Sequence, residues 1–341
     1  MNEPRLIRVL RGERLEPLPV WLMRQAGRYL PEYRAVRAEA GGFLELVMDS
    51  PRAAEVTLQP LRRFDLDAAI LFSDILVVPW ALGQELRFAA GEGPLLAPLD
   101  DRMLAGLDPA RAPARWAPVA ATVARVVASL PRGVPLIGFC GAPLTVAAYM
   151  LDGRGGDFRR TRALIAAGDP LLERTLALLA EASIGYLRAQ LDAGASVLQL
   201  FESHGGLADD ATLERLVLGP TRTIVAAMRE SHPEVPLIGF PRGGGQWLGR
   251  YAAETGVDCV GIDTATRLAD TCRMLPEGVA VQGNLDPRIV VAGGRTMEGA
   301  IHALRREGAA RAHVFNLGHG ITPDTPPAHV AALVDAVRRP T

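Results

Sequence analysis

The sequence contains no lysine, although it is 341 residues long and carries 37 basic side chains, all of them arginine. Schiff-base aldolases and pyridoxal-phosphate enzymes form a covalent bond to a lysine amine. P-loop nucleotide-binding proteins use a lysine to contact phosphate. The missing lysine therefore excludes all three classes. A genome rich in GC codons is the simplest cause of this bias.

Cysteine is almost absent, and the three present form no recognisable pattern. Cys140 and Cys259 lie inside apolar, strand-like runs, where a small buried thiol is ordinary, and Cys272 stands alone. No C-x-x-C or H-x-C spacing of the kind that holds zinc occurs. The odd number of cysteines predicts neither a disulfide framework nor a metal site, and it favours a reducing cytoplasm.

Long apolar runs and a large net charge are also missing. No stretch approaches the roughly 18 apolar residues that span a bilayer, and the charged start of the chain lacks the apolar centre of a signal peptide. The net charge of −1 argues against a general nucleic-acid or membrane-surface binder. We therefore expect a cytoplasmic protein without nucleic-acid or membrane partners. Apolar residues make up 49% of the chain, enough for a sizeable core.

Short apolar runs alternate with helical patterns along the whole chain. Continuous apolar runs are typical of parallel strands buried on both faces. The runs are Pro19–Met23, Asp67–Phe72, Val134–Cys140, Ala195–Phe201, Val235–Phe240, Val257–Asp263, Val279–Gly283 and His313–Leu317. The helical patterns are Pro51–Phe64, Ala117–Leu130, Asp169–Asp192, Ala211–Ser231, Thr266–Leu275, Met297–Arg306 and Ala328–Arg338.

Eight strand–helix units in this length predict an α/β protein, a single (β/α)₈ TIM barrel spanning residues 1–341. The barrel would carry an N-terminal extension and an insertion after the second strand, Leu76–Asp108, which is rich in Pro and Gly. A doubly wound open sheet is the structural alternative. That fold calls for a Gly-rich dinucleotide loop after its first strand, and Met23–Arg28 is not such a loop.

In a barrel the chemistry gathers on the loops that follow the strands, and polar residues follow nearly every predicted strand here. The first such loop places Arg24 and Arg28 four residues apart with Gly27 between them. Arginine matches a carboxylate with two parallel hydrogen bonds, so the pair indicates an anion site. The other strand ends carry Ser73 and Asp74, the stretch Gly141–Tyr149, Glu202 with Ser203 and His204, Arg242 with three glycines, Asp263, Asn284 with Asp286, and His319.

Asp74 is the single most informative of these residues about function. It is one carboxylate in a long apolar stretch, where an isolated charge is costly unless it is paired or used. It could cap a helix or pair with an arginine. The functional alternative is an acceptor for ligand N–H groups, or a stabiliser of a developing cation.

Two more strand ends carry residues able to bind a carboxylate. His319 lies between two glycines, which allow a tight turn with the imidazole projecting inward, although a surface histidine is the alternative. Tyr149, judged alone, reads as a core tyrosine. Ser203 and His204 are sequence neighbours and no G-x-S-x-G elbow is present, so we discount serine hydrolysis.

Several of these motifs together resemble those of the uroporphyrinogen decarboxylase family, in collinear order over nearly the whole chain. One departure is Glu202-Ser203-His204-Gly205, where many bacterial members carry Asp-Ser-Trp-Ala; the serine is retained. The matching stretches are Pro19–Glu32, Phe72–Leu76, Gly141–Pro143 with Tyr149-Met150, Phe201–Gly206, Phe240–Gly243, Gln282–Pro287 and Phe315–Gly320.

The resemblance implies a (β/α)₈ barrel, a homodimer, and catalysis without metal or organic cofactor. It implies removal of the four acetate carboxyl groups of uroporphyrinogen III, giving coproporphyrinogen III and CO₂. The residues expected to bind this substrate are Arg24, Gln25, Ala26, Gly27, Arg28, Asp74, Tyr149, Ser203 and His319.

The residue chemistry agrees with that expectation. A pyrrole protonated on carbon is its own electron sink, and Asp74 would stabilise the cationic ring nitrogen. We expect Arg28 to donate the proton and Arg24 to clamp a carboxylate, so that Asp74, Arg28 and Arg24 are the candidate catalytic residues. Two alternatives stay open: a corrinoid or thiol methyltransferase of the same superfamily, and a tetrapyrrole carrier without activity.

Overall fold

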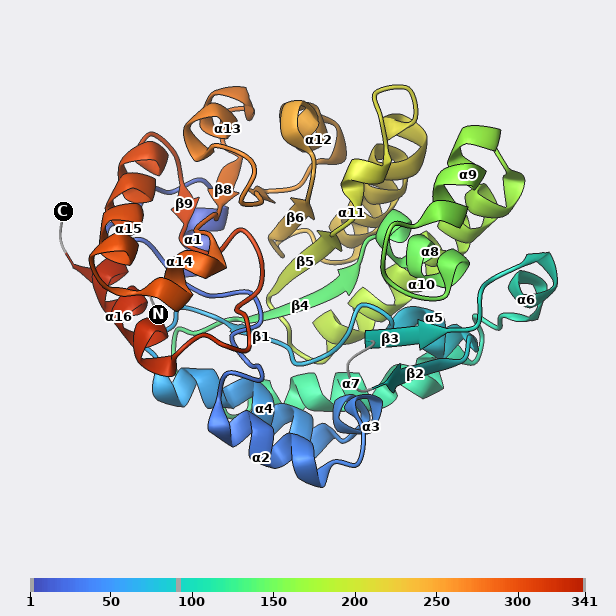
Figure 1. Cartoon of the computed structure of the whole chain (residues 1–341), viewed down its shortest axis with the longest axis horizontal. Helices are drawn as coiled ribbons and strands as arrows, with labels where there is room; N and C mark the ends of the chain where they lie inside the picture. The colour runs from blue at the N-terminus through green and yellow to red at the C-terminus, as the bar shows by residue number, and fades with distance from the viewer. Residues whose placement is uncertain (1–2, 90–92, 340–341) are drawn as a thin grey trace.

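The computed structural model describes residues 3–89 and 93–339, and its centre is a curled sheet of seven parallel strands (Figure 1). Each strand pairs with the next along the chain, apart from a separate hairpin described below. In sheet order the strands are β1 (Ala69–Ile70), β4 (Leu136–Gly141), β5 (Val197–Glu202), β6 (Leu237–Pro241), β7 (Cys259–Gly261), β8 (Ala280–Gln282) and β9 (His313–Val314).

The predicted first strand, Pro19–Met23, is wrong as a strand. It makes one isolated parallel bridge, between Val20 and Phe315, and Val20 also accepts the Asp67 N–H at 2.8 Å. Proline nitrogen cannot donate, and the Val20 N–H is taken by the Asp67 side chain at 2.7 Å, so no regular ladder forms. The segment nevertheless links the β9 and β1 edges of the sheet by backbone hydrogen bonds.

The predicted helices are present, with shifted ends, around the outside of the sheet (Figure 1). The predicted Ala211–Ser231 pattern is divided into a π-helical turn, Glu214–Leu218, and α11. Asp169 shows why such helices begin where they do, because its carboxylate accepts the Leu171 N–H at 2.8 Å. The predicted helices are α4 (Ser50–Arg63), α7 (Ala112–Val127), α10 (Pro170–Asp192), α11 (Gly219–Ser231), α13 (Leu268–Met274), α15 (Gly294–Gly308) and α16 (Pro327–Arg338). A further helix between β6 and β7, α12 (Leu248–Thr255), was not predicted.

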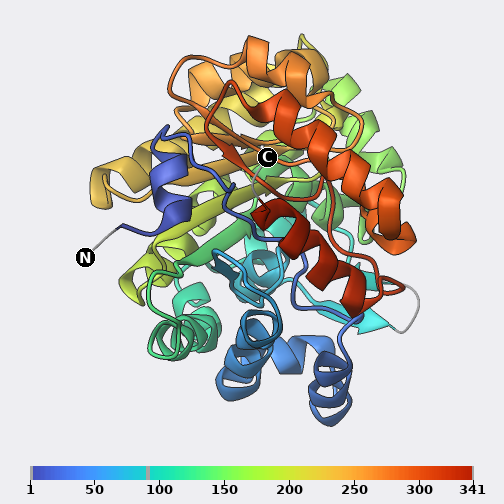
Figure 2. The same cartoon turned by 90° about the vertical axis from the view of Figure 1, so that its left-hand side faces the viewer.

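Shorter elements cover the two ends of the sheet, with α1 (Arg5–Leu10) at one end and a β-hairpin at the other (Figure 2). Residues 76–108, apart from 90–92, which lie outside the described residues, contain α5 (Val77–Leu82), hairpin strands β2 (Leu86–Ala89) and β3 (Gly93–Leu96), and α6 (Asp101–Gly106). The remaining helices are α2 (Pro31–Glu39), α3 (Phe43–Met48), α8 (Pro143–Asp152), α9 (Arg159–Ala167) and α14 (Pro287–Ala292).

The interior of the sheet is buried on both faces, as the continuous apolar runs predict. Every residue of β4 and β6 is buried. Three buried polar side chains form a chain of hydrogen bonds inside: the Trp21 indole donates to Gln282 at 2.9 Å, and the Gln282 amide donates to Gln199 at 3.2 Å. A buried polar group without such a partner would destabilise the fold, so these side chains define how the segment Pro19–Trp21 seats against the sheet.

Candidate functional site

The turn that carries Arg24 is held by backbone contacts at the carboxyl edge of the sheet. Asn316 accepts the Met23 N–H at 3.0 Å, and the Met23 carbonyl accepts the Ile321 N–H at 2.9 Å. Arg24 itself has φ of 60°, a left-handed conformation that is unfavourable for a residue with a side chain. A Cβ atom at Gly320 would lie 2.3 Å from Arg24 Cδ, so only glycine there lets the exposed Arg24 side chain lie where it does.

The residues that follow Arg24 differ in their exposure, and the first of them stabilises the turn. Gln25 is 0% exposed, and its amide accepts from Leu22 N and donates to Ala68 O, both at 3.1 Å. Ala26 and Gly27 are half-buried, whereas Arg28 is exposed. The charge of Arg28 counters the burial that raises the pKa of Tyr33, so Arg28 lies within electrostatic reach of α2.

Asp74 follows β1 and combines the two roles considered from the sequence. Its Oδ1 accepts the Leu76 N–H at 2.8 Å just before α5 begins, and the side chain is partly exposed. Burial raises the pKa of Asp74 to about 6, while the Leu76 N–H and the charge of Arg24 act in the opposite direction. The hydrogen bond fixes the carboxylate in place and leaves its charge without an ion pair among residues 3–89 and 93–339.

Three aromatic rings pack together at this edge, and one of them, Tyr149, lies within electrostatic reach of Asp74. Tyr149 on α8 lies 5.5 Å from Phe158 and 5.6 Å from His204, centroid to centroid, and Phe158 lies 4.5 Å from His204. Burial and the Asp74 charge raise the pKa of Tyr149, and Arg24 and Arg242 oppose the rise. Burial and Arg242 lower the pKa of His204 to about 4, so that its imidazole is neutral at pH 7.

The neutral His319 ring can donate one hydrogen bond, from Nε2. Its Nδ1 accepts the Gly320 N–H at 2.8 Å, which assigns the proton of the neutral ring to Nε2. Burial first, then the charges of Arg24 and Arg242, lower its pKa. A Cβ atom at Gly318 would lie 2.5 Å from Thr264 N, so the glycine before His319 is required by a close approach of the β7 loop.

The structure therefore brings four of the predicted site residues within electrostatic reach of one another: Arg24, Asp74, Tyr149 and His319. Ser203 is half-buried in the loop that also carries His204. The Gln25 side chain bonds within the turn, and the Arg28 side chain is exposed within reach of α2. The residue roles assigned from the sequence stay predictions.

Two residues at this edge received no role from the sequence. Arg242 acts on Tyr149, His204 and His319 through its charge. Glu202, 0% exposed, accepts the Thr145 hydroxyl, and its other carboxylate oxygen has no hydrogen-bond partner among the described residues. Both are polar residues at strand ends, which was the available signal, but only the packing shows what surrounds them.

No cofactor site was predicted, and no group of three metal-ligating side chains occurs within residues 3–89 and 93–339. All three cysteines are buried, and burial raises the pKa of Cys140 to about 12, so that this thiol is protonated at neutral pH. Within the same ranges, no helix is both long and apolar enough to cross a bilayer.

Comparison with solved structures supports the fold. The chain is similar to a methyltransferase from Methanosarcina mazei, with a TM-score of 0.80 over 98% of each chain. The sequence identity is 21%, so this likeness concerns the fold alone.

Comparison of the sequence is more specific. The model of the family described as "Uroporphyrinogen decarboxylase (URO-D)" matches residues 1–340. A protein of Granulibacter bethesdensis named uroporphyrinogen decarboxylase is 52% identical over 342 residues, covering 99% of both chains. One of the same name from Acidiphilium cryptum is 52% identical over 337 residues, covering 98% of this chain and 94% of its own. The chain belongs to the uroporphyrinogen decarboxylase family.

Proposed function

We propose that this protein removes the four acetate carboxyl groups of uroporphyrinogen III in sequence, producing coproporphyrinogen III and CO₂. The single observation that carries the proposal is the Asp74 carboxylate, fixed by the Leu76 N–H and free of an ion pair among the described residues, within reach of Arg24 and Tyr149. The family membership adds the substrate that fits this set of charges.

Each decarboxylation needs a place for the electron pair of the broken C–C bond. Protonation of the pyrrole carbon next to the acetate makes the ring cationic, and the electron pair then flows into it as CO₂ leaves. The exocyclic carbon takes up a proton to become a methyl group, and the ring carbon loses its added proton. The net change exchanges a carboxylate for a proton, so no oxidant, reductant or cofactor is required.

Asp74 suits the charge that develops in this reaction. A carboxylate held in place stabilises the cationic ring nitrogen without reorganising at the moment of reaction. Its Oδ1 is fixed by the Leu76 N–H. The pyrrole N–H groups can converge on the same carboxylate, so successive rings could use one site by turning of the substrate.

The remaining predicted residues bind the substrate periphery. We assign Arg24 to a substrate carboxylate, because its guanidinium shares its surroundings with Asp74 and His319. Arg28, whose side chain is exposed, delivers the proton directly or through a water that it orients. Tyr149, Ser203 and His319 donate hydrogen bonds to carboxylate oxygens.

The wider assignments form part of the same proposal. The seven strands and the segment Pro19–Trp21 are taken as one (β/α)₈ barrel with an N-terminal extension and an insertion after β1. We propose a homodimer in the cytoplasm that acts without metal or organic cofactor. The backbone hydrogen bonds that link the two edges of the sheet support the barrel, and the family membership supports the other assignments.

The test is anaerobic incubation of the purified protein with uroporphyrinogen III, followed by separation of the products by their number of carboxyl groups. We expect intermediates with seven, six and five carboxyl groups and then the four-carboxyl product, with the same rate after dialysis against a chelator. Tight binding without products would indicate the carrier alternative. Activity that needs a metal would favour the methyltransferase alternative.

A further inference from the structure

The backbone of Arg242 is fixed on both sides at the end of β6. Its N–H donates to the Glu202 carbonyl at 3.0 Å, and its carbonyl accepts the Gly206 N–H at 3.2 Å. The following N–H, of Gly243, donates to the buried Asp263 carboxylate at 2.6 Å. The loops after β5 and β7 thus hold this residue between them, and its position does not depend on a flexible loop.

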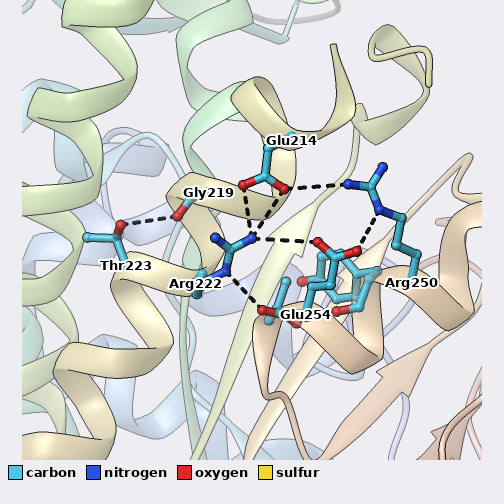
Figure 3. A network of polar contacts seen from close by, with 8 residues as sticks. Glu214, Gly219, Arg222, Thr223, Arg250 and Glu254 are labelled. Atoms are coloured by element: carbon cyan, nitrogen blue, oxygen red, sulfur yellow. Dashed lines mark hydrogen bonds and ion pairs between the residues drawn. The ribbon is translucent and has the colours of Figure 1, made fainter. Parts of the chain in front are cut away.

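The guanidinium group of Arg242, in contrast, is exposed and makes no hydrogen bond or ion pair with residues 3–89 or 93–339. Arginines on the outer helices of the same region are paired with glutamates (Figure 3). Arg250 on α12 contacts Glu254 at 2.6 Å and Glu214 at 3.6 Å, and Arg222 contacts Glu214 at 3.0 Å. Arg242, eight residues before Arg250, has a fixed backbone but no carboxylate partner among the described residues.

The position of β6 in the ring adds a geometric argument. Counting from the segment Pro19–Trp21 through β1, β4 and β5, β6 is four steps away in either direction. Arg24 and Arg242 therefore start from opposite sides of the sheet. Both charges nevertheless act on Tyr149 and His319. They oppose the rise in the pKa of Tyr149 because they stabilise its phenolate, and they lower the pKa of His319 because they favour its neutral imidazole. Both residues therefore follow strand ends at the same edge of the sheet, from which either charge reaches Tyr149 and His319.

The acidic groups near Arg242 are already used by the fold. Asp263 accepts from Gly243, Ala265 and Thr266, and Glu202 accepts from Thr145. Asp74 is then the one carboxylate among the described site residues that is left for the substrate. Arg24 and Arg242 are then two exposed cations at this edge that form no ion pair among the described residues, which is complementary to a substrate with eight carboxylates.

We propose that Arg242 binds a propionate of the tetrapyrrole at the rim opposite the carboxylate held by Arg24. This inference rests on the proposed function. Acetates disappear one by one, whereas the propionates are retained through all four reactions. A clamp that serves every step while the substrate turns must therefore use a propionate.

The experiment compares Arg242→Gln and Arg242→Lys with Arg250→Gln, which removes an exposed arginine from α12 outside the site. Initial rates are measured with uroporphyrinogen III and with the pentacarboxylic porphyrinogen. We expect Arg242→Gln to raise KM about ten- to a hundredfold for both substrates, with a much smaller change in kcat, because a charge-assisted hydrogen bond to the substrate is lost. We expect Arg242→Lys to recover part of the loss and Arg250→Gln to behave like the wild type.

The outcomes separate the two proposals. If the wild type forms no products from uroporphyrinogen III, the proposed function itself fails. If the wild type is active and Arg242→Gln matches Arg250→Gln, Arg242 does not bind substrate. A penalty confined to uroporphyrinogen III would overturn the propionate assignment, and a loss of kcat at unchanged KM would overturn the clamp. The urea midpoint of each variant checks that the fold is intact.

Discussion

Replacing Asp74 by asparagine separates the charge of this side chain from its hydrogen bond. The amide oxygen of asparagine can still accept the Leu76 N–H that the carboxylate accepts at 2.8 Å. The variant therefore retains the cap before α5 and loses only the negative charge. We expect kcat to fall at least about a thousandfold, since a fixed group that stabilises developing charge is commonly the largest catalytic contribution.

The same substitution is expected to stabilise the folded protein. Burial raises the pKa of Asp74 from 3.8 to about 6, so between these values the folded state holds a proton that the unfolded state has lost. The stability of the wild type therefore falls as the pH rises from about 4 to 6. At 1.36 kcal/mol per pH unit this gives a loss of about 3 kcal/mol as an upper limit, and partial exposure reduces it to about 1–2 kcal/mol.

Two assays check these numbers. Urea unfolding at pH 4 and pH 7 should show the stability gain of Asp74→Asn at pH 7 and little difference at pH 4. For the wild type, kcat/KM should rise with pH through about 6, as the carboxyl group ionises.

The matched control is Asp169→Asn, because Asp169 accepts the Leu171 N–H with the same 2.8 Å geometry at the start of α10, outside the site. This variant should keep full activity. Near-wild-type turnover by Asp74→Asn, or equal losses in both variants, would refute the role of the charge.

Three further substitutions test separate parts of the structure. Arg28→Lys should retain KM and lose turnover if Arg28 delivers the proton; steady-state kinetics measure both, and unchanged turnover excludes that role. Glu202→Gln should abolish a stability loss of up to about 3 kcal/mol that the wild type shows as pH rises from about 4.5 to 7, because burial raises the pKa of Glu202 to about 7; urea midpoints against pH measure it, and parallel curves would contradict it. Trp21→Phe removes the donor to Gln282 and should cost about 1–3 kcal/mol in unfolding free energy; an unchanged midpoint would show that this buried pair contributes nothing.

Local side-chain patterns predicted the regular elements because those patterns report burial directly. The continuous apolar run Val134–Cys140 becomes β4, buried along its whole length. The Asp169-Pro170 pair predicts the start of α10, because a carboxylate cap and a proline at the first position act within one turn. These signals need no knowledge of the rest of the chain.

Sequence patterns are insufficient where a residue distant in the sequence decides the local structure. Pro19–Met23 reads as a strand, but the side chain of Asp67 takes the N–H that a neighbouring strand would use. The substrate contact of Gln25 stays a prediction, and the structure adds that its side-chain amide is enclosed between Leu22 and Ala68. Neither partner can be identified from the spacing of residues in the sequence.

The sequence by itself determined the class of fold, the family and the kinds of charge in the site, because these follow from composition, periodicity and contiguous motifs. Only the tertiary structure decided which charged side chains lie within electrostatic reach of the same groups. Arg24 and Arg242 are 218 positions apart by their residue numbers and belong to opposite sides of the sheet, yet both act on His319. Electrostatic interactions depend on distance in space, and only the curling of the parallel sheet brings these side chains together.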